Sequence, residues 1–316
     1  MTSPLTIAHI SDLHLSAVHR RVNIRNTRRL LDHIARLNVD HLVVTGDITA
    51  TAEEADFQLA RKIFAGYGLL NPRRMSVTIG NHDVFGGVHA AEEILDFPRR
   101  CRKTNVRRKV EMFVESFGEL FRGTVVASER HTFPYLKSLG GVVLVGMNSV
   151  AEYSSVRNPV GANGAVDQKQ QERLDRLLSS SPFNHLRKIV LIHHHFNKVE
   201  SEAIGTMHSV WQMIEQQTMK LRGKKDLMDL FRKHSVDAVL HGHYHQNMEY
   251  SRKGLRFVNG GGSVLSLSPS VLHLNVLRVS DAGVEVQMHE MPSLTLNADR
   301  PALPASVPAL SSHAAA

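Results

Sequence analysis

The feature that most constrains the fold is a regular alternation of short apolar runs with helical patterns along most of the chain. The apolar runs are rich in Val, Ile and Leu, which is typical of buried strands. They are 6–10, 41–45, 75–79, 142–147, 188–192 and 238–240. Helices are predicted between them at 24–37, 53–64, 167–179 and 224–234, the first with Asn23 as its N-cap. This alternation predicts an α/β fold, with parallel strands and helices on both faces of the sheet.

The pattern changes after Gly254. Residues 255–259, 271–279 and 284–289 are predicted strands, and the turn residues 280–283 join the last two as a hairpin. We expect a second, more antiparallel sheet there. The segment 292–316 contains four prolines and ends in three alanines, so we expect a disordered tail after a single domain at 1–291.

Residues 85–129 interrupt the alternation. This insertion holds seven basic residues with no acid between them, which are Arg99, Arg100, Arg102, Lys103, Arg107, Arg108 and Lys109. Apolar residues follow at helical spacing, at Val110, Phe113, Val114, Phe117, Leu120 and Phe121. A basic amphipathic helix is therefore predicted, and two interpretations stay open. Its apolar stripe packs on the core, or the insertion forms a lid or substrate platform beside the active site.

Composition excludes several classes of protein. With 316 residues, 42% hydrophobic and 22% charged, the chain resembles ordinary globular proteins and differs from disordered or fibrous ones. No apolar run reaches the roughly 20 residues that a membrane-spanning helix needs. The N-terminus has no signal-peptide pattern, so we expect the mature chain to begin at or near Met1. The single cysteine, Cys101, excludes an internal disulfide and favours the reducing cytoplasm.

Polar motifs follow the ends of five predicted strands. They are Asp12-Leu13-His14, Gly46-Asp47, Gly80-Asn81-His82-Asp83, His193-His194-His195 and Gly242-His243-Tyr244-His245. Ligands of open α/β sheets gather at the carboxyl ends of the strands, so these motifs are expected to form one site. Carboxylate, imidazole and amide groups are ligands of divalent cations, and Asp47 suits a bridge between two ions. The glycines at 46, 80 and 242 are expected to allow close approach of the backbone.

In this order, the motifs D-x-H, G-D, G-N-H-D, H-H-H and G-H-x-H resemble those of the calcineurin-like metallophosphoesterase superfamily over residues 6–246. Within it the chain is most similar to bacterial 3′,5′-cyclic-nucleotide phosphodiesterases. The resemblance implies a four-layer α/β/β/α sandwich of two mixed sheets flanked by helices. It also implies that Asp12, His14, Asp47 and His245 bind one metal ion. Asp47, Asn81, His193 and His243 would bind the other.

The resemblance also assigns chemistry. His82 corresponds to the histidine beside the scissile phosphate, where an imidazolium stabilises charge or protonates the leaving oxygen, and Asp83 would orient its ring. The nucleophile would be a water or hydroxide between the metals. Manganese, iron, zinc and cobalt all suit the ligand set. Phe196 follows the histidine triplet where the family often has proline, which leaves the shape of this loop open.

We therefore expect a binuclear-metal phosphoesterase that hydrolyses a small phosphodiester of the cyclic-nucleotide type. One alternative is a UDP-2,3-diacylglucosamine pyrophosphate hydrolase whose basic segment, at 97–121, contacts an anionic membrane. Another is a nuclease or phosphomonoesterase of the same superfamily. The net charge of +8 fits anionic partners, but nucleic acid is the weaker candidate because the basic segment has few aromatic residues for stacking.

Overall fold

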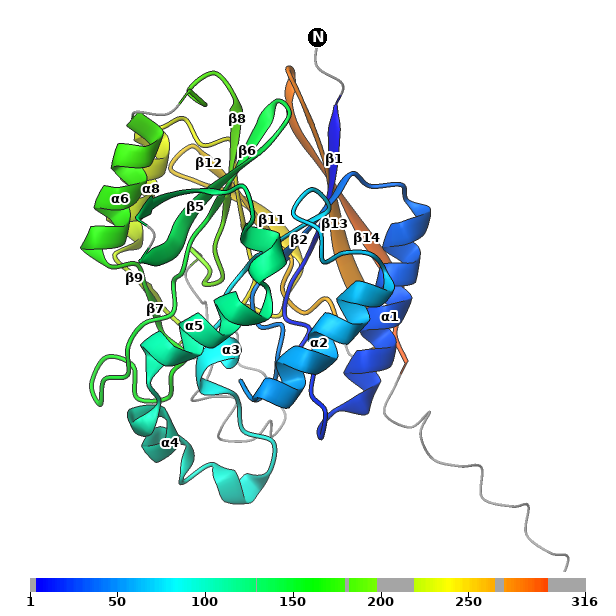
Figure 1. Ribbon diagram of the computed structural model, residues 1–316, viewed down its shortest axis with the longest axis vertical. Coiled ribbons are helices and arrows are strands. Elements are labelled where there is room, and N and C mark those ends of the chain that lie inside the picture. The colour runs from blue at the N-terminus through cyan, green and yellow to red at the C-terminus, as the bar shows by residue number, and fades with distance from the viewer. Residues whose placement is uncertain (1–3, 129, 180–181, 198–218, 265–269, 295–316) are drawn as a thin grey trace, which may run out of the picture.

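The computed structural model describes residues 4–128, 130–179, 182–197, 219–264 and 270–294. Its strands form two large sheets and a small one (Figure 1). The order in the first sheet is β14 (Gly283–Pro292), β13 (Val271–Ser280), β1 (Leu5–Ile10), β2 (His41–Thr45) and β3 (Met75–Thr78). The order in the second is β11 (Met248–Arg252), β12 (Leu255–Asn259), β10 (Ala238–His241), β8 (Arg187–Leu191), β6 (Val142–Gly146), β5 (His131–Leu139) and β4 (Val125–Ser128). The small sheet pairs β7 (Gly164–Ala165) with β9 (Leu221–Arg222).

Both large sheets are parallel in the middle, as the alternation predicts. The parallel strands are β1, β2 and β3 in one sheet and β6, β8, β10 and β12 in the other. The expectation that the C-terminal strands form a second sheet of their own is wrong. The hairpin of β13 and β14 joins the first sheet, antiparallel to β1, whereas β12 extends the second sheet. Pairing between strands this far apart in sequence depends on the tertiary fold, and no local pattern reports it.

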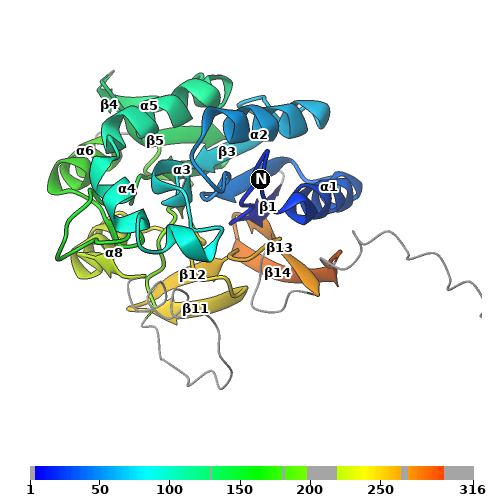
Figure 2. The ribbon, with the colours of Figure 1, turned by 90° about the horizontal axis from the view of Figure 1, so that it is seen from below.

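Helices cover the outer faces of the two sheets, which gives four layers (Figures 1 and 2). The helices α1 (Arg21–Arg36) and α2 (Glu54–Gly66) pack on the first sheet, and α6 (Gln168–Ser179) and α8 (Lys224–Lys233) pack on the second. Alternate residues of one strand face different layers, because Ile7 lies in the core between the sheets while Ala8 lies under the helices. The predicted sandwich of two mixed sheets flanked by helices is confirmed.

The first helix begins earlier than its sequence predicts. Arg20 occupies the N-cap position, and Asn23 lies within the helix, where its Nδ2 donates a hydrogen bond to the His14 carbonyl at 3.2 Å. The prediction of Asn23 as N-cap is therefore wrong. Its amide instead ties the helix to the first polar motif, which is a tertiary contact that capping preferences do not predict.

The helix α3 (His82–Phe85) ends where the insertion begins. The insertion itself folds as two separate short helices, α4 (Phe97–Lys103) and α5 (Val106–Ser116), with 3-10 turns at Ala91–Glu93 and Gly118–Phe121. The predicted single helix is broken before α5, where the Asn105 side chain accepts a hydrogen bond from the Arg108 N–H at 3.0 Å and caps α5. Phe113 and Phe117 are fully buried, and their rings lie against each other and against Phe57 of α2. The interpretation that the apolar stripe packs on the core is confirmed for these residues. Strands β4 and β5, in and just after the insertion, were not predicted.

Acidic neighbours pair with most of the basic side chains of the insertion. The ion pairs are Arg99–Asp96, Arg100–Glu93, Arg107–Glu111, Arg108–Glu115 and Lys109–Glu53. The local excess of positive charge is therefore smaller than the sequence indicates. A contact of residues 97–121 with an anionic membrane stays a prediction, and it would depend on the exposed basic groups because Phe113 and Phe117 are buried.

The last strand extends further than predicted. β14 continues to Pro292, and Leu294 exchanges hydrogen bonds with the Asn26 side chain of α1 at 2.8 and 3.3 Å. The first residues of the predicted tail therefore belong to the fold, and the rest of that prediction, 295–316, lies outside the described residues. Among the described residues, no helix is long and apolar enough to span a membrane.

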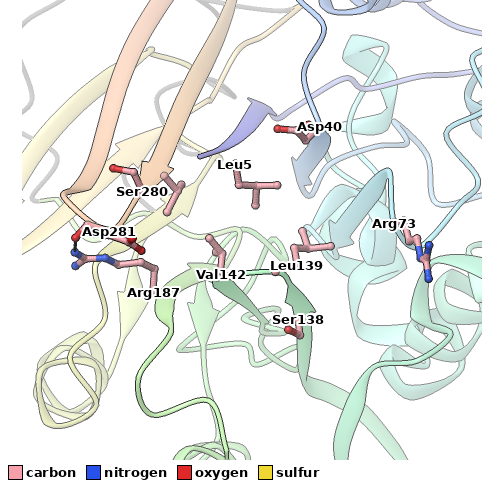
Figure 3. Close-up of a pocket in the computed structure, with 12 residues that line it drawn as sticks. Leu5, Asp40, Arg73, Ser138, Leu139, Val142, Arg187, Ser280 and Asp281 are labelled. Carbon is pink, nitrogen blue, oxygen red and sulfur yellow. Dashed lines mark hydrogen bonds between the residues drawn. The ribbon is translucent and has the colours of Figure 1, made fainter. Parts of the chain in front are cut away.

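A cavity of about 510 Å³ lies at the end of the sheets where β1, β6 and β8 begin. Its apolar lining includes Leu5, Leu139 and Val142, and at its edge Arg187 donates a hydrogen bond to the Asp281 carbonyl (Figure 3). The polar motifs follow the opposite, carboxyl ends of the strands. This cavity is therefore separate from the site that the motifs form.

We predict that Phe117→Ala lowers the free energy of unfolding by about 3–5 kcal/mol, because it removes a fully buried aromatic ring from the core. Urea denaturation followed by circular dichroism measures this change. Arg102→Ala, an exposed position of the same insertion, is the control and should change the value by less than about 0.5 kcal/mol. An unchanged stability of Phe117→Ala would instead mean that the insertion is a loosely held lid.

Candidate metal centre

The five polar motifs converge at the carboxyl ends of β1, β2, β3, β8 and β10. Asp12, Asp47, Asn81, His193 and His243 each lie within three residues of the end of a strand, and all five are buried. Parallel pairing places these ends at one edge of each sheet, and the core between the sheets brings the two edges together. The prediction that the motifs form a single site is therefore confirmed by their positions.

Three groups of side chains could each hold a metal ion. They are Asp12, His14 and His245; then His14, Asp47 and His82; then Asp47, His193 and His243, and within each group the candidate ligand atoms lie within 4.8 Å of one another. Neighbouring groups share His14 or Asp47, so the three form one continuous row. Each end group consists of three residues from one of the two ligand sets that the sequence predicts, and Asp47 shares the middle group with His14 and His82.

The spacing of the ligand atoms is close. His193 Nε2 lies 3.3 Å from Asp47 Oδ2 and 3.0 Å from Asn81 Oδ1. At the other end, His14 Nε2 lies 3.2 Å from His245 Nε2, which lies 3.5 Å from Asp12 Oδ1. Two ring nitrogens that face each other either share a proton or bind a common cation.

The residues fit divalent cations, and the ring of His243 provides the test. Its Nε2 is buried and has no hydrogen-bond partner among the described residues. An unpaired buried nitrogen is costly, and a cation at this end of the row would satisfy it. The His193 ring is oriented for the same purpose, because its Nδ1 donates to the Thr45 carbonyl at 2.8 Å and leaves Nε2 directed at the row.

Four of the candidate ligands have left-handed backbone conformations. The φ angles are 58° at Asp12, 42° at His14, 50° at Asp47 and 70° at His243. Such conformations cost on the order of 1 kcal/mol each and persist only where the surrounding structure enforces them. Hydrogen bonds between the motifs do so here, since the His14 N–H donates to the Asp47 carbonyl at 3.0 Å and the His243 N–H donates to the Asp12 carboxylate.

Three glycines allow the polar motifs to approach each other. A Cβ atom at Gly80 would overlap Asp47, both at its backbone nitrogen and at its carboxylate, and one at Gly46 would overlap the His193 ring. At Gly242 a Cβ would overlap the Ser11 hydroxyl and the Asp12 carboxylate. The expectation that these glycines permit close backbone approach is confirmed.

Burial and neighbouring charges determine the protonation of the row. Burial lowers the pKa of His14 and of His243 well below the usual value, so both rings are neutral and can donate a lone pair. Burial alone would raise the pKa of Asp47, but His193, His82 and His14 hold it well below its usual range. Burial would also lower the pKa of His193, yet the charge and hydrogen bond of Asp47 raise it to about 9.

Asp83 holds the loops together. Its carboxylate accepts hydrogen bonds from the Thr49 N–H at 2.8 Å, the Thr49 hydroxyl at 3.0 Å and the Gly80 N–H at 3.0 Å. These bonds join the third motif to the loop after the second, and the expectation that Asp83 orients the His82 ring stays a prediction. Burial, followed by the charge of Asp47, raises the pKa of Asp83 to about 6.

His82 lies at the exposed side of the row. Its ring is partly exposed and stands edge-on to the His14 ring, with 4.5 Å between centroids. Its backbone N–H donates to Asp47 Oδ1 at 2.8 Å. The structure therefore places His82 beside the candidate ligands, with a ring nitrogen close enough to His14 and Asp47 to take part in binding an ion as well.

The loop after the histidine triplet is held by residues that the sequence analysis did not identify. The Tyr250 hydroxyl accepts a hydrogen bond from the Phe196 N–H at 3.2 Å and pairs with His241 Nε2 at 2.8 Å, while Arg252 donates to the Phe196 carbonyl. The Phe196 ring is buried against Phe257. Hydrogen bonds and packing, rather than a proline ring, thus fix the shape of this loop. Tyr250 lies on a distant strand, so no motif could have linked it to the triplet.

The other two histidines of the triplet face the protein. His194 Nδ1 pairs with the Ser149 hydroxyl at 2.8 Å, and His195 Nε2 donates to the Met219 carbonyl at 2.8 Å. His193 is the member of the triplet that belongs to the row of candidate ligands.

Comparisons with known proteins agree with this geometry. The model of the Calcineurin-like phosphoesterase family matches residues 5–247. A protein described as a probable cyclic nucleotide phosphodiesterase, from Ruthia magnifica subsp. Calyptogena magnifica, is 19% identical over 267 residues, which are 83% of this chain and 88% of that protein.

Two solved structures share the fold. A dimetal phosphatase from Danio rerio superposes with a TM-score of 0.59 at 12% identity, over 92% of this chain and 99% of that one. A purple acid phosphatase from yellow lupin seeds superposes with a TM-score of 0.57 at 16% identity, over 92% of this chain and 52% of that one.

We predict that Gly80→Ala weakens the affinity for Mn²⁺ about 10–100-fold, because the added methyl group displaces Asp47. Isothermal titration calorimetry of the metal-free protein measures the affinity. Gly66→Ala at the end of α2 is the matched control, since a Cβ there meets no atom within 4 Å. Equal affinities of the two variants would show that Asp47 does not hold the ion.

Proposed function

Because the chain belongs to the calcineurin-like phosphoesterase family, a family of metal-dependent phosphoester hydrolases, we propose that it hydrolyses phosphodiesters at a binuclear metal centre formed by the row of candidate ligands. The observation that carries the proposal is the sharing of Asp47 and His14 between adjacent groups. Two ions that act on one phosphate lie about 3.5–4 Å apart, which requires a bridging carboxylate of this kind.

The proposed ligands are those at the two ends of the row. Asp12, His14, Asp47 and His245 would hold one ion, and Asp47, Asn81, His193 and His243 the other. When bound, such ions lower the pKa of water, which supplies the nucleophile, and neutralise charge on the phosphate. The nitrogen and oxygen ligands suit manganese, iron, zinc and cobalt alike.

We assign His82 the role of proton donor. Its partly exposed ring lies beside the buried ligands, where a phosphate bound to the row would meet it. A ring N–H there can donate a hydrogen bond to a phosphate oxygen or give its proton to the leaving oxygen. Asp83 is a positioning residue in this proposal, because it holds the loop of Gly80 against Thr49.

The similarity to the Ruthia magnifica protein supports a cyclic-nucleotide type of substrate. A lipid pyrophosphate is less supported, because Phe113 and Phe117, which could have held acyl chains, are buried in the core. Phosphomonoesters and nucleic acids remain alternatives that the assay below separates. A cytoplasmic location stays a prediction from the cysteine content.

We predict that the protein with Mn²⁺ hydrolyses bis(p-nitrophenyl) phosphate faster than p-nitrophenyl phosphate, and that Asp47→Asn loses at least about 100-fold of this activity. The release of p-nitrophenolate measures both rates. Asp229→Asn, at an exposed position of α8, is the matched control. Faster hydrolysis of the monoester would replace the diesterase by a phosphatase, and full activity of Asp47→Asn would refute the metal mechanism.

We predict that His82→Ala lowers kcat by about 10²–10⁴-fold while the bound metal is retained. If His82 protonates the leaving oxygen, the loss is larger for a diester with an alkyl leaving group than for one with p-nitrophenolate, which leaves without a proton. Steady-state kinetics with both substrates and metal analysis of the variant measure these effects. A loss of metal in His82→Ala would make His82 a ligand instead.

A further inference from the structure

We propose that His19 and His89 form a base-binding platform beside the metal centre, so that the preferred substrates are phosphodiesters that carry a nucleoside. This inference rests on the proposed function and specifies its substrate class. The two residues are called the imidazole stack below.

The imidazole stack joins two segments that are far apart in the sequence. His19 lies in the loop between β1 and α1, and His89 lies in the insertion. Their rings are nearly parallel, with an interplanar angle of 10° and 4.4 Å between centroids. Both side chains are partly exposed, and the neighbouring Val18 is 74% exposed. Part of the imidazole stack is therefore accessible to solvent, beside the exposed side chain of Val18.

The stack is anchored to the loops that carry the candidate ligands. His89 Nε2 donates to the Ala50 carbonyl at 3.3 Å, and the Ala50 N–H donates to the Leu15 carbonyl at 2.9 Å, next to His14. Two residues before His89, Gly87 lies so close to the His82 ring that a Cβ there would overlap it. The platform therefore borders the side of the row where His82 is exposed.

Charge connects the stack to the same site. Burial, followed by the charges of Arg20 and His19, lowers the pKa of His89 to about 4. Arg20 also contributes to the low pKa of His14, after burial and the charge of His82. Arg20 thus lies near both the stack and the metal centre, where its guanidinium favours an anionic phosphate.

These properties suit a nucleobase. A neutral imidazole presents a π-face that stacks on any base, and such stacking is typical of nucleotide-binding proteins. A base on the stack would leave its phosphate next to Arg20 and His82. An acyl chain would gain little from a surface of two partly exposed rings, which is why a lipid is the poorer occupant.

Two diesters with the same leaving group test the platform. Thymidine 5′-(p-nitrophenyl phosphate) and methyl p-nitrophenyl phosphate both release p-nitrophenolate, and only the first carries a base. We expect a higher kcat/KM for the thymidine ester in the wild-type protein with Mn²⁺. In His89→Ala, the ratio of the two kcat/KM values should fall roughly 5- to 150-fold, chiefly through KM of the thymidine ester. His89→Phe, which keeps a flat ring, should retain most of the ratio.

The remaining outcomes separate the two proposals. His33→Ala, which changes a partly exposed histidine of α1, is the control and should keep both rates. Equal losses on both esters in His89→Ala would overturn the platform, because His89 would then position the metal loops. Unchanged rates on both esters would overturn it as well. A wild-type protein that binds Mn²⁺ but cleaves neither ester would overturn the proposed function itself.

Discussion

The structure depends on the buried carboxylate of Asp47, whose negative charge must be compensated at the junction of the two sheets. Burial of an unpaired charge is strongly unfavourable, and Asp47 is 1% exposed. Its compensation comes from the His193 ring at 3.3 Å and the His82 N–H at 2.8 Å. These neighbours reach Asp47 only because Gly46 and Gly80 have no side chain, and because Asp47 itself adopts a left-handed conformation. The left-handed backbone, the glycines and the histidines are thus consequences of burying this one carboxylate. A pair of cations would compensate its charge further.

Much of the site could be predicted because its determinants are local. Each candidate ligand lies within four residues of the end of an apolar strand, and chain direction alone brings the ends of parallel strands to one edge. The same holds for Gly80, because the glycine itself indicates that another part of the chain approaches the backbone closely there. Asp83 was predicted near the site for the same reason, but its partners were not. They are Gly80 of its own motif and Thr49, which follows the second motif, and the bond to Thr49 depends on the distance between two loops.

The features that could not be predicted are those set by distant residues. β13 pairs with β1 across more than two hundred and fifty residues, as in the register of Leu5 with Val279, so no local pattern could assign it to the first sheet. Tyr250 holds the loop of Phe196 from another strand, and Asn23 holds the first motif from within a helix. Asn23 is a residue type that local preference would use as a cap, and here its amide makes a tertiary contact instead.

The insertion shows how stability and selectivity are combined in one segment. Its aromatic residues Phe113 and Phe117 are buried in the core. Lys109 donates a hydrogen bond to the Ala52 carbonyl, in the same loop whose Ala50 carbonyl accepts a hydrogen bond from His89. A lid would have to break these contacts each time it opened, and exposing two buried aromatic rings costs several kcal/mol. A fixed wall has no such cost, and it presents the imidazole stack in the same position before and after substrate binds. The selectivity that we infer is therefore preorganised, which reduces the entropy lost on binding.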